Sequence, residues 1–584
     1  MNLNHDSSAA IVGADGTPIA AMGEERITRI KNQFGIPRHA VNFITQLYPD
    51  LEYSEIIVGS HSVIKTDPVS LSNFQRGGDI YWRYLLSVDE KNHIDIVNSP
   101  LPPGWLRENQ GQLADVSLID ESNFFDLVKE IVADSENMSK TTISGTNHHD
   151  GHQMSAFIAS NFKEALVISL DGEGDHESGA VSIMQRSSQG VVQSRQLARI
   201  PSTDSLGALY SNVTKRYGFT ASKHEGKITG LAAYGRNSHA LEVLSNFVEV
   251  ANGVPKIDFE GKHSSKQGQI KYSFRDAVDS LSWKGQFPDL AFGIQELLEK
   301  VVLEIIEYWV DYTGISNIAI AGGVFANVRV NQRIAELSSV NGIYIYPNMG
   351  DGGLAIGGVW ARMAAKGIPI TTEQGGSVFL GPTAYSQNEL DGIRQQPLQL
   401  ESGLQIAQII SEGKIVGVIL GDMEWGPRAL GHRSLLADPR DSNINVTLNK
   451  RLRRTEFMPF APVVQEEMLR TVFDTDQIDD LRNFENMTMT VQVRDKYRSL
   501  LGAVTHVDGS ARPQTVNKMS NPLYHSIIGS FFKLTGSPCI VNTSFNAHEE
   551  PIVWNMKDAL KALKGGVCDF VTDGEHLYFL EPES

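Results

Sequence analysis

The chain has 584 residues, of which 41% are hydrophobic and 21% charged, and its 51 basic and 69 acidic side chains give a formal net charge of −18. This length and composition predict a globular protein of two or more domains, and the acidic balance argues against a large nucleic-acid-binding face, although a local basic pocket for a phosphorylated small molecule is compatible with it. Two cysteines are too few for a disulfide framework, and no apolar run of about twenty residues or signal segment occurs, so we expect a soluble cytoplasmic protein without a membrane partner.

Two similar units in the first third of the chain predict β-hairpins. In residues 8–22, two apolar runs flank the turn Asp15-Gly16. In residues 165–184, two apolar runs flank Asp171-Gly172-Glu173-Gly174. Two hairpins that each carry an acidic, glycine-containing element suggest a duplicated α/β core, with a ligand in the cleft between the halves.

Between these units, residues 147–152 contain a pair of histidines with the spacing of metal ligands. His148 and His152 stand four residues apart, so on a helix both imidazoles project from one face, which suits a divalent first-row metal. For such a pair alone, a polar helix end with solvated histidines is the alternative. Asp351 is a third candidate ligand, and Asp171 is a fourth whose alternative role is to form a turn.

Further along, apolar segments alternate between helical and strand spacing. We expect helices over 290–312, 328–337 and 354–365, and strands over 317–321 and 343–346. Gly322 and Gly323 directly follow the first strand, and Asp351 lies in a glycine-rich loop after the second. Open α/β sheets bind ligands at such strand ends, where backbone N–H groups stabilise anionic oxygens. With the segment Glu225-Gly226-Lys227, these motifs predict a metal-assisted phosphate or nucleotide site.

A stretch rich in Gly, Pro, Thr and Gln predicts a linker region over 371–400, and the remainder predicts a second domain of about 190 residues. The informative residue of this part is arginine. Guanidinium groups pair with phosphate oxygens in a fixed geometry, so several converging arginines suit a triphosphate and a second phosphorylated substrate. A surface salt bridge is the better explanation for any single arginine, but it fits poorly with arginines embedded among Gly, Pro and Trp. The segments concerned are 425–434, 438–440, 451–460, 506–512 and 542–546.

Together these segments resemble the O-carbamoyltransferases of the nodulation-factor and antibiotic-tailoring family, among them the nebramycin, cephamycin and ansamycin enzymes. The resemblance extends over essentially the whole chain. It rests on ordered motifs: Asn4-His5-Asp6-Ser7-Ser8-Ala9-Ala10, Glu24-Glu25-Arg26 with Arg29 and Lys31, the pair His148 and His152, Glu225-Gly226-Lys227, the loops at 322–324 and 350–353, and the segments 426–431, 508–512 and 542–546.

The resemblance implies an α/β protein with two domains. The first, over 1–370, would be a duplicated actin/Hsp70-like ATPase-type domain of the kind used in threonylcarbamoyl-tRNA synthesis. The second, over 401–584, would be an α/β domain similar to threonylcarbamoyl-AMP synthase. The implied reaction has two steps. Carbamoyl phosphate and ATP give carbamoyl-adenylate and pyrophosphate in the second domain, and an acceptor hydroxyl then attacks the adenylate in the first domain and releases AMP.

The resemblance also implies roles for residues of the first domain. Iron would bind to His148, His152 and Asp351, although two histidines and a carboxylate equally admit zinc or manganese. The metal would neutralise the phosphate charge of the leaving AMP. His5 and Asp6 are candidates for the base that receives the acceptor proton, or they orient the N-terminal hairpin. The residues expected to hold the nucleotide are Lys227, Gly322, Gly323 and Asn327.

In the second domain, the residues expected to bind carbamoyl phosphate and the ATP phosphates are Arg428, Arg433, Arg454, Arg512 and Ser544. Arg512 and Ser544 are also the candidate catalytic residues of adenylate formation. Mg²⁺ should accompany ATP and bridge its phosphates. Relatives often carry an arginine where this chain has Met458, so that Arg451 or Arg454 would have to compensate.

Two other functions stay open at this point: threonylcarbamoyl transfer to tRNA, and a nucleotide-binding scaffold without transfer chemistry. The net charge of −18 counts against tRNA, and a scaffold would leave the arginine motifs without a role. The expected acceptor is a hydroxyl of a small natural product or sugar. The aromatic-rich residues 67–125 predict either an acceptor lid or an ordinary inserted subdomain, and a homodimer is the family-based expectation.

Overall fold

The computed structural model describes residues 1–3, 5–33, 37–60, 141–260, 273–284, 287–373, 375–383, 390, 392–398, 402–454 and 457–581. The predicted acceptor lid at 67–125 lies outside the described residues, as does Asn4 of the first motif. Within the described part, no helix is both long and apolar enough to cross a membrane.

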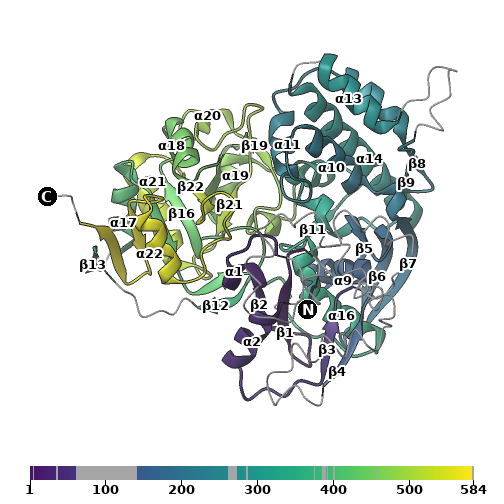
Figure 1. The fold of residues 1–584 in the computed structure, drawn as a ribbon, viewed down its shortest axis with the longest axis horizontal. Coiled ribbons are helices and arrows are strands. Elements are labelled where there is room, and N and C mark those ends of the chain that lie inside the picture. The colour runs from purple at the N-terminus through teal and green to yellow at the C-terminus, as the bar shows by residue number, and fades with distance from the viewer. Residues whose placement is uncertain are drawn as a thin grey trace, which may run out of the picture.

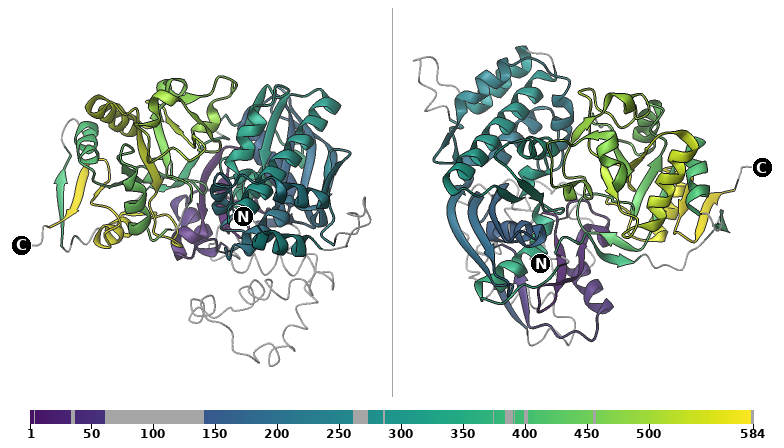
Figure 2. Two further views of the ribbon diagram at one scale, coloured as in Figure 1. Left: turned by 90° about the horizontal axis from the view of Figure 1, so that it is seen from above. Right: turned by 180° about the vertical axis from the view of Figure 1, so that it is seen from behind.

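Two bodies lie side by side, and the N-terminal segment lies between them in all three views (Figures 1 and 2). That segment, dark purple in Figure 1, contains β1 (Ser8–Val12), β2 (Pro18–Gly23) and α1 (Glu24–Thr28). Its arginines reach the C-terminal body: Arg26 Nη2 donates to the Gly426 carbonyl at 3.2 Å, and Arg29 donates to the carbonyls of Pro551 and Ile552 at 2.8 Å each. The two bodies are therefore joined through the start of the chain.

The N-terminal body is built on a five-stranded mixed sheet. β10 is parallel to both β11 and β5, and β6 is antiparallel to both β5 and β7. The strand order is β11 (Gly342–Ile345), β10 (Asn317–Ala321), β5 (Glu164–Gly174), β6 (Glu177–Arg186) and β7 (Val192–Pro201).

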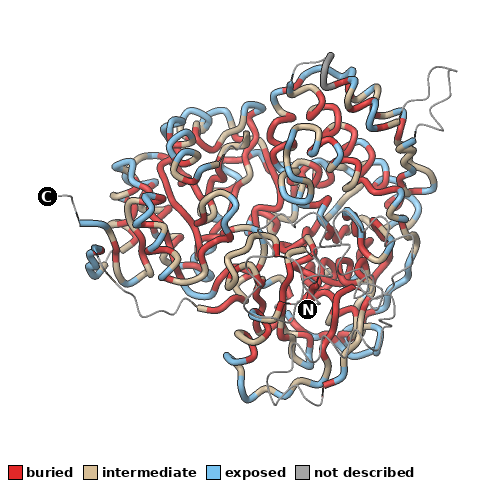
Figure 3. Tube along the Cα trace, viewed as in Figure 1, coloured by how far each residue is buried: buried red, intermediate tan, exposed pale blue. Residues whose placement is uncertain are grey.

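Helices cover both faces of this sheet because successive side chains of its strands point to opposite faces and are apolar on both. Val167 and Ala319 pack in one cluster with α9 (His148–Ser160) and α16 (Leu354–Ala365). Their neighbours Ile168 and Ile320 pack in another cluster, which includes residues of the long helix α14 (Asp289–Thr313) and of α10 (Leu206–Arg216). Figure 3 shows this interior in red, with exposed positions on the outer helices.

The C-terminal body has an eight-stranded mixed sheet. Successive residues of its central strands again pack in two different clusters, one with α17 (Ser402–Ser411) and α21 (Pro522–Thr535), the other with α22 (Met556–Lys564). The strand order is β13 (Ile393–Pro397), β24 (His576–Leu580), β23 (Phe570–Thr572), β14 (Val416–Ile419), β16 (Arg433–Ala437), β22 (Cys539–Ser544), β17 (Ala461–Gln465) and β21 (Gln514–Val516).

The mixed α/β class is confirmed, and so are the two hairpins, the three helices and the two strands expected from apolar spacing. The actin-like and synthase-like descriptions stay predictions. The stretch 371–400, expected to be a linker, contains β12 (Phe379–Thr383), which pairs with β15 (Asp422–Glu424), and β13, which pairs with β24. The composition of this stretch hides these strands because their pairing partners lie far along the chain.

Candidate functional site

The ends of three adjacent parallel strands meet at one edge of the N-terminal sheet. Asp171 lies near the carboxyl end of β5, Gly322 and Gly323 follow β10, and Asp351 follows β11. Such edges are where open α/β sheets bind ligands, and the glycine loops had predicted this placement. Side chains that are far apart in the sequence are therefore brought together by strand order alone.

The fourth element at this edge is the start of α9. Asn147 caps the helix, and its side-chain oxygen accepts from the backbone N–H groups of His149 and Asp150. His148 and His152 are one turn apart on the helix, both are buried, and their Nε2 atoms lie 3.1 Å from each other. The predicted four-residue spacing on one helix face is confirmed.

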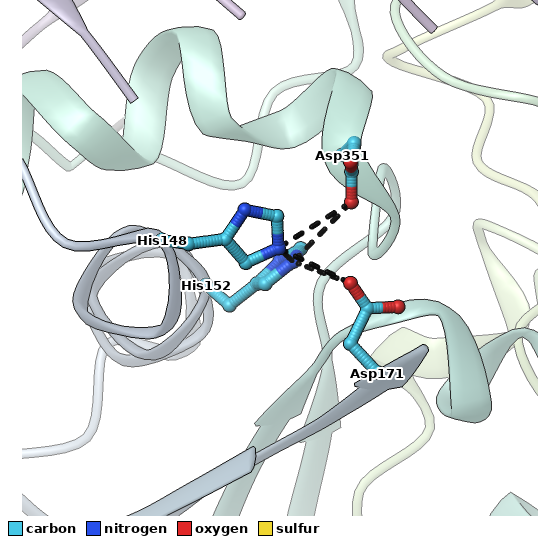
Figure 4. Close-up of side chains that lie close together, drawn as sticks. All are labelled: His148, His152, Asp171 and Asp351. Carbon is cyan, nitrogen blue, oxygen red and sulfur yellow. Dashed lines mark hydrogen bonds and ion pairs between the residues drawn. The ribbon is translucent and has the colours of Figure 1, made fainter. Parts of the chain in front are cut away.

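His148, His152, Asp171 and Asp351 form one buried cluster, in which the four candidate ligand atoms all lie within 4.8 Å of one another (Figure 4). Asp171 Oδ2 lies 3.1 Å from His148 Nε2 and 3.5 Å from His152 Nε2, and Asp351 Oδ1 lies 3.6 Å and 3.7 Å from the same two atoms. Asp351 Oδ1 has no hydrogen-bond partner in the described part of the chain. Two nitrogens and two carboxylate oxygens that face one another in a buried space suit a bound cation.

Asp171 therefore lies among the candidate ligands rather than in a turn. β5 continues through Gly174, and the turn to β6 is formed by Asp175 and His176. The turn expected at 171–174 is thus displaced toward the C-terminus. Asp171 Oδ1 accepts from the Gly323 backbone N–H at 2.8 Å, which fixes the orientation of the carboxylate.

The electrostatics of the cluster favour positive charge at its centre. Burial by itself lowers the pKa of His152, but the nearby negative carboxylates of Asp171 and Asp351 outweigh it and raise that pKa to about 9. Burial opposes ionisation of Asp171, yet the two histidines hold its pKa well below the usual value. Burial and the neighbouring imidazoles lower the pKa of His149 to about 3, so this third histidine stays neutral. A metal ion would supply the positive charge that protons otherwise provide.

His5 lies at the rim of this cluster. Its Nδ1 is 3.0 Å from Asp6 Oδ2, and its Nε2 is 3.4 Å from Asp351 Oδ2. Burial lowers the pKa of His5, but Asp351 and Asp6 outweigh it and raise the pKa to about 10. The structure thus brings both candidate bases to the metal-type cluster. The contact between His5 and Asp351 could not be found from sequence spacing.

The predicted nucleotide-binding residues have structural contacts of their own. Gly322 adopts a φ of +105°, and a Cβ there would stand 2.2 Å from the Leu170 carbonyl oxygen, so no other residue fits. Asn327 caps α15 (Val328–Ala335), and its amide donates to Gln295 Oε1 at 2.8 Å. Lys227 is 5% exposed in α11 (Glu225–Ala232), and its Nζ stands 5.4 Å above the Phe219 ring. These contacts position the loops around the cluster.

The arginine segments converge at one edge of the C-terminal sheet. β16 begins at Arg433 opposite the end of β22, where Ser434 pairs with Ser544. β17 begins opposite the same end of β22, and β21 begins beside β17 in parallel register. The loops that precede β16, β17 and β21 and the loop that follows β22 therefore share this edge. These loops carry the predicted residues Arg428, Arg454 and Arg512, and Ser544 is the last residue of β22.

The individual arginines at this edge differ in their environments. Arg454 Nη2 donates to Ser544 Oγ at 2.8 Å and to Asn546 Oδ1 at 2.7 Å, which ties two of the segments together. The Nε atom of Arg428 is buried without a hydrogen-bond partner in the described residues, whereas Arg512 lines a neighbouring cavity. Burial also lowers the pKa of Arg428. The Arg428 guanidinium therefore retains donor capacity that an anionic ligand could use.

Arg433 does not fit the predicted phosphate-binding role. Its side chain is 0% exposed, and all three guanidinium nitrogens donate to backbone carbonyls. The acceptors are the carbonyls of Pro382, Leu420, Gly421, His432 and Trp554, at 2.7 to 3.4 Å. Because its donors are occupied and water cannot reach it, Arg433 stabilises the loops at this edge instead of reaching a ligand.

A cavity of about 200 Å³ lies between the two bodies, next to this edge. Its walls come from α11, α14 and α15 on one side and from the segments 458–460 and 504–512 on the other. Polar and charged lining residues include Thr229, Gln295, Glu299, Arg329, His506 and Arg512. The sequence did not predict the N-terminal wall, because its residues come from three helices without a shared motif.

A second group of possible ligands joins the two bodies at the surface. His224 Nε2 lies 3.0 Å from Glu549 Oε1, and His548 Nε2 lies 3.4 Å from the same atom. The Thr220 backbone N–H donates to His224 Nδ1, so the neutral ring carries its proton on Nε2, facing Glu549. This arrangement favours a hydrogen-bonded bridge between the bodies over a metal site.

Comparison with known proteins identifies the family. A model described as the carbamoyltransferase N-terminus matches residues 2–360, and one described as the carbamoyltransferase C-terminus matches residues 407–578. Nodulation protein NolNO of Sinorhizobium fredii is 30% identical over 98% of this chain and 78% of its own length. The 3'-hydroxymethylcephem-O-carbamoyltransferase of Amycolatopsis lactamdurans is 30% identical over 59% of this chain and 63% of its own.

Among solved structures, the match to full-length HypF in its phosphate- and nucleotide-bound form covers 32% of this chain and 22% of the HypF chain. The sequence identity is 17% and the TM-score is 0.22, a likeness too slight to support an argument. The family matches cover most of the described chain, including the buried cluster and the arginine-rich edge. The protein therefore belongs to the carbamoyltransferase family, as the resemblance to nodulation and antibiotic-tailoring enzymes had indicated, and is a carbamoyltransferase.

Proposed function

We propose that this carbamoyltransferase is ATP-dependent and carbamoylates a hydroxyl group through a carbamoyl-adenylate intermediate. The observation that carries the proposal is the presence of two chemically different sites in one chain. One is a buried cluster of two histidines and two aspartates, which suits a metal, and the other is a sheet edge lined by arginines, which suits phosphates. A single activation step or a single transfer step would need only one of them.

Adenylate formation is assigned to the C-terminal edge. Water cleaves the P–O bond of carbamoyl phosphate, which releases inorganic phosphate and leaves carbamate. A carbamate oxygen then attacks the α-phosphorus of ATP, and pyrophosphate leaves as carbamoyl-adenylate forms. We assign Arg428 and Arg512 to the phosphate oxygens, because Arg428 has a buried Nε without a hydrogen-bond partner in the described residues and Arg512 lines the cavity next to this edge. Arg454 and Ser544 hold the neighbouring loops together and offer further donors at the same edge. Mg²⁺ would accompany ATP.

Transfer to the acceptor is assigned to the N-terminal cluster. His148, His152, Asp171 and Asp351 would hold a divalent metal, with iron as the family-based candidate. When bound, that metal would neutralise the phosphate charge of the departing AMP. The acceptor oxygen attacks the carbonyl carbon of the adenylate, and the bond between that carbon and the AMP phosphate oxygen breaks. A small hydroxyl compound is the proposed acceptor class, because one relative is a 3'-hydroxymethylcephem-O-carbamoyltransferase.

His5 is the candidate acceptor of the hydroxyl proton. The negative charges of Asp351 and Asp6 raise its pKa to about 10, so His5 is protonated at neutral pH while Asp351 carries its full charge. Neutralisation of Asp351 by a cation removes the first of these influences and returns His5 toward its ordinary pKa. Loading of the cluster would therefore also enable His5 to act as a base.

The test separates the two sites by their products. Protein is incubated with ATP, Mg²⁺ and carbamoyl phosphate, without an acceptor, and pyrophosphate and carbamoyl-adenylate are followed by mass spectrometry. Pyrophosphate release that depends on carbamoyl phosphate is expected in the unmodified protein and in His148→Ala. Arg512→Ala should lower it by about a hundredfold, the usual effect of removing a group that stabilises transition-state charge.

Arg440→Ala is the matched control, because that arginine lies in the same domain but is paired with Asp438 at 2.6 Å. It should release pyrophosphate like the unmodified protein. An unmodified protein that releases no pyrophosphate in any metal condition would contradict the activation step. An equal loss in Arg440→Ala and Arg512→Ala would contradict the assignment of Arg512 to the phosphates.

A further inference from the structure

The candidate ligand His148 lacks the support that metal-binding histidines normally have. Such a histidine usually donates the N–H of its second ring nitrogen to a carboxylate, carbonyl or water, which fixes the ring for the metal. His148 directs Nε2 toward Asp171 and Asp351, but its Nδ1 is buried without a hydrogen-bond partner in the described part of the chain. The orientation of this ring must therefore be set by other contacts.

One of these contacts is the packing of Gly174 against the ring. A Cβ at position 174 would stand 2.2 Å from His148 Cγ and 2.3 Å from its Cδ2, much closer than carbon atoms approach without bonding. The φ of Gly174 does not require glycine, so the need for a small residue comes from the imidazole itself. The end of β5 thus forms one wall of the slot that holds the ring.

The second contact comes from the next residue, Asp175. Its Oδ2 accepts from the His148 backbone N–H at 2.7 Å, and its Oδ1 accepts from Ser60 Oγ at 3.0 Å. The first N–H groups of a helix have no partner within the helix, so Asp175 satisfies the donor of the very residue that carries the candidate ligand. It also connects the start of α9 to the loop after β3 (Glu55–Val58).

The backbone of Asp175 is held in an unusual conformation. Asp175 and His176 form the two-residue turn between β5 and β6 with φ values of +53° and +65°, a region that residues other than glycine, asparagine and aspartate seldom adopt. The His176 side chain is exposed, whereas the Asp175 carboxylate accepts from the first residue of α9. The turn therefore presents one carboxylate to the backbone of His148.

We propose that Asp175 is a positioning residue for the metal ligand His148, and that it replaces the missing support at Nδ1; this inference rests on the proposed metal site. Asp171 and Asp175 belong to the same hairpin, so one element both supplies a ligand and places its partner. A shift of the hairpin tip moves the first turn of α9, and with it the His148 ring, relative to Asp171 and Asp351.

The test measures metal binding directly and does not depend on catalysis. Co²⁺ is titrated into metal-free protein, and the affinity and the visible d–d absorption bands are recorded. Asp175→Gly keeps the positive φ without strain but removes the carboxylate, and it should weaken Co²⁺ binding about tenfold to a hundredfold and alter the bands. Asp175→Asn keeps an acceptor oxygen and tolerates the turn, and it should restore affinity to within about threefold of the unmodified protein.

His176→Asn is the matched control, because it changes the neighbouring turn residue without touching α9, and its Co²⁺ affinity and spectrum should be unchanged. The inference is overturned if Asp175→Gly binds Co²⁺ with the affinity and spectrum of the unmodified protein, or if Asp175→Asn and His176→Asn lose as much as Asp175→Gly. An unmodified protein that binds no Co²⁺ would overturn the metal site of the proposed function, and this inference with it. Unchanged binding in Asp175→Gly, or equal losses in all three variants, would leave the proposed metal site itself intact.

Discussion

The two candidate sites of this chain are held together in opposite ways. In the N-terminal cluster, the donor atoms of His148, His152 and the two aspartates face one another in a buried space. At the C-terminal edge, the arginines point in different directions: Arg433 is enclosed by backbone carbonyls, while Arg454 joins two loops through Ser544. The first site is defined by side chains that share one centre, and the second by loops that share one edge.

This difference decides what each site requires for its function. Nitrogen and carboxylate donors that share one buried centre suit a cation, so the geometry of the N-terminal cluster favours one class of ligand. A guanidinium group can stabilise a loop as well as a phosphate, so charge alone does not assign an arginine. The comparison therefore predicts that substitutions in the cluster change chemistry, whereas substitutions at the edge divide into those that change chemistry and those that change stability.

The largest effect is expected for His148→Ala. Metal-assisted neutralisation of a leaving group contributes several kcal/mol, so its loss should slow carbamoyl transfer by about a thousandfold. Transfer to an acceptor is measured with preformed carbamoyl-adenylate, which bypasses the activation step, and bound metal is measured by elemental analysis.

His149→Asn serves as the control, because this neighbour is buried on the same helix turn but its Nδ1 lies 3.1 Å from Ser169 Oγ, outside the cluster. It should retain both metal and transfer. A His148→Ala protein that keeps its metal, or that loses metal without losing transfer, would break the proposed link between the cluster and the chemistry.

Next in size is the effect of Arg433→Met on stability. Removal of the guanidinium leaves buried carbonyls without their donor, and each unsatisfied group costs about 1–3 kcal/mol, so the free energy of unfolding should fall by roughly 3 kcal/mol or more. Chemical unfolding of the C-terminal body, followed by tryptophan fluorescence, measures this change. The folded fraction of Arg433→Met should bind ATP with the affinity of the unmodified protein. A stable variant that loses ATP affinity would restore Arg433 to the phosphate site.

How far the sequence predicts these sites depends on whether the relevant geometry is local. His148 and His152 could be predicted because their spacing places both on one helix face. Asp351 could be predicted because it follows an apolar run that is typical of a strand. Asp171 was ambiguous because a glycine after an aspartate is typical of a turn. The turn lies at Asp175 and His176 instead. Gly174 is needed for close packing against the His148 imidazole and not for its backbone conformation.

The C-terminal arginines were less predictable because their partners are backbone atoms. The carbonyls that surround Arg433 come from five separate positions, and no sequence pattern marks a carbonyl as an acceptor. The strands β12 and β13 were missed for a related reason, since they are defined by pairing with β15 and β24 and not by their own apolar content. Sequence reasoning thus found segments that share one sheet edge but could not show that backbone carbonyls enclose the Arg433 side chain.

A smaller effect is expected for Arg454→Lys. Lysine keeps the positive charge but cannot reach Ser544 Oγ and Asn546 Oδ1 together in the way that the planar guanidinium does. Loss of one or two hydrogen bonds of a charged group, at about 1.5 kcal/mol or more each, should raise the KM for ATP roughly tenfold, with a smaller change in unfolding free energy than in Arg433→Met. Steady-state kinetics of pyrophosphate release measure it. An unchanged KM would indicate that Arg454 has no part in arranging the edge.

The smallest effect concerns the dependence of stability on pH, and it sharpens the comparison because it tests the electrostatics of the N-terminal cluster. In the metal-free protein the pKa of His152 is raised from 6.5 to about 9. A raised pKa means that the protonated ring stabilises the folded state fully below about pH 6.5, and that this contribution is lost as the pH rises through about 9. The melting temperature of metal-free protein should therefore fall by a few degrees over this range.

The melting temperature of metal-loaded protein should fall less over the same pH range. A bound cation would balance the negative charges of Asp171 and Asp351 even when the histidines are deprotonated. The low pKa of Asp171 keeps that carboxylate ionised throughout, so its titration adds nothing between pH 6.5 and 9. Removal of the titrating ring in His152→Asn should make the metal-free profile less steep, while the contribution of His5 remains. Parallel profiles for the metal-free, metal-loaded and His152→Asn proteins would mean that protons and metal do not compete for this cluster, which would remove the electrostatic argument for a metal there.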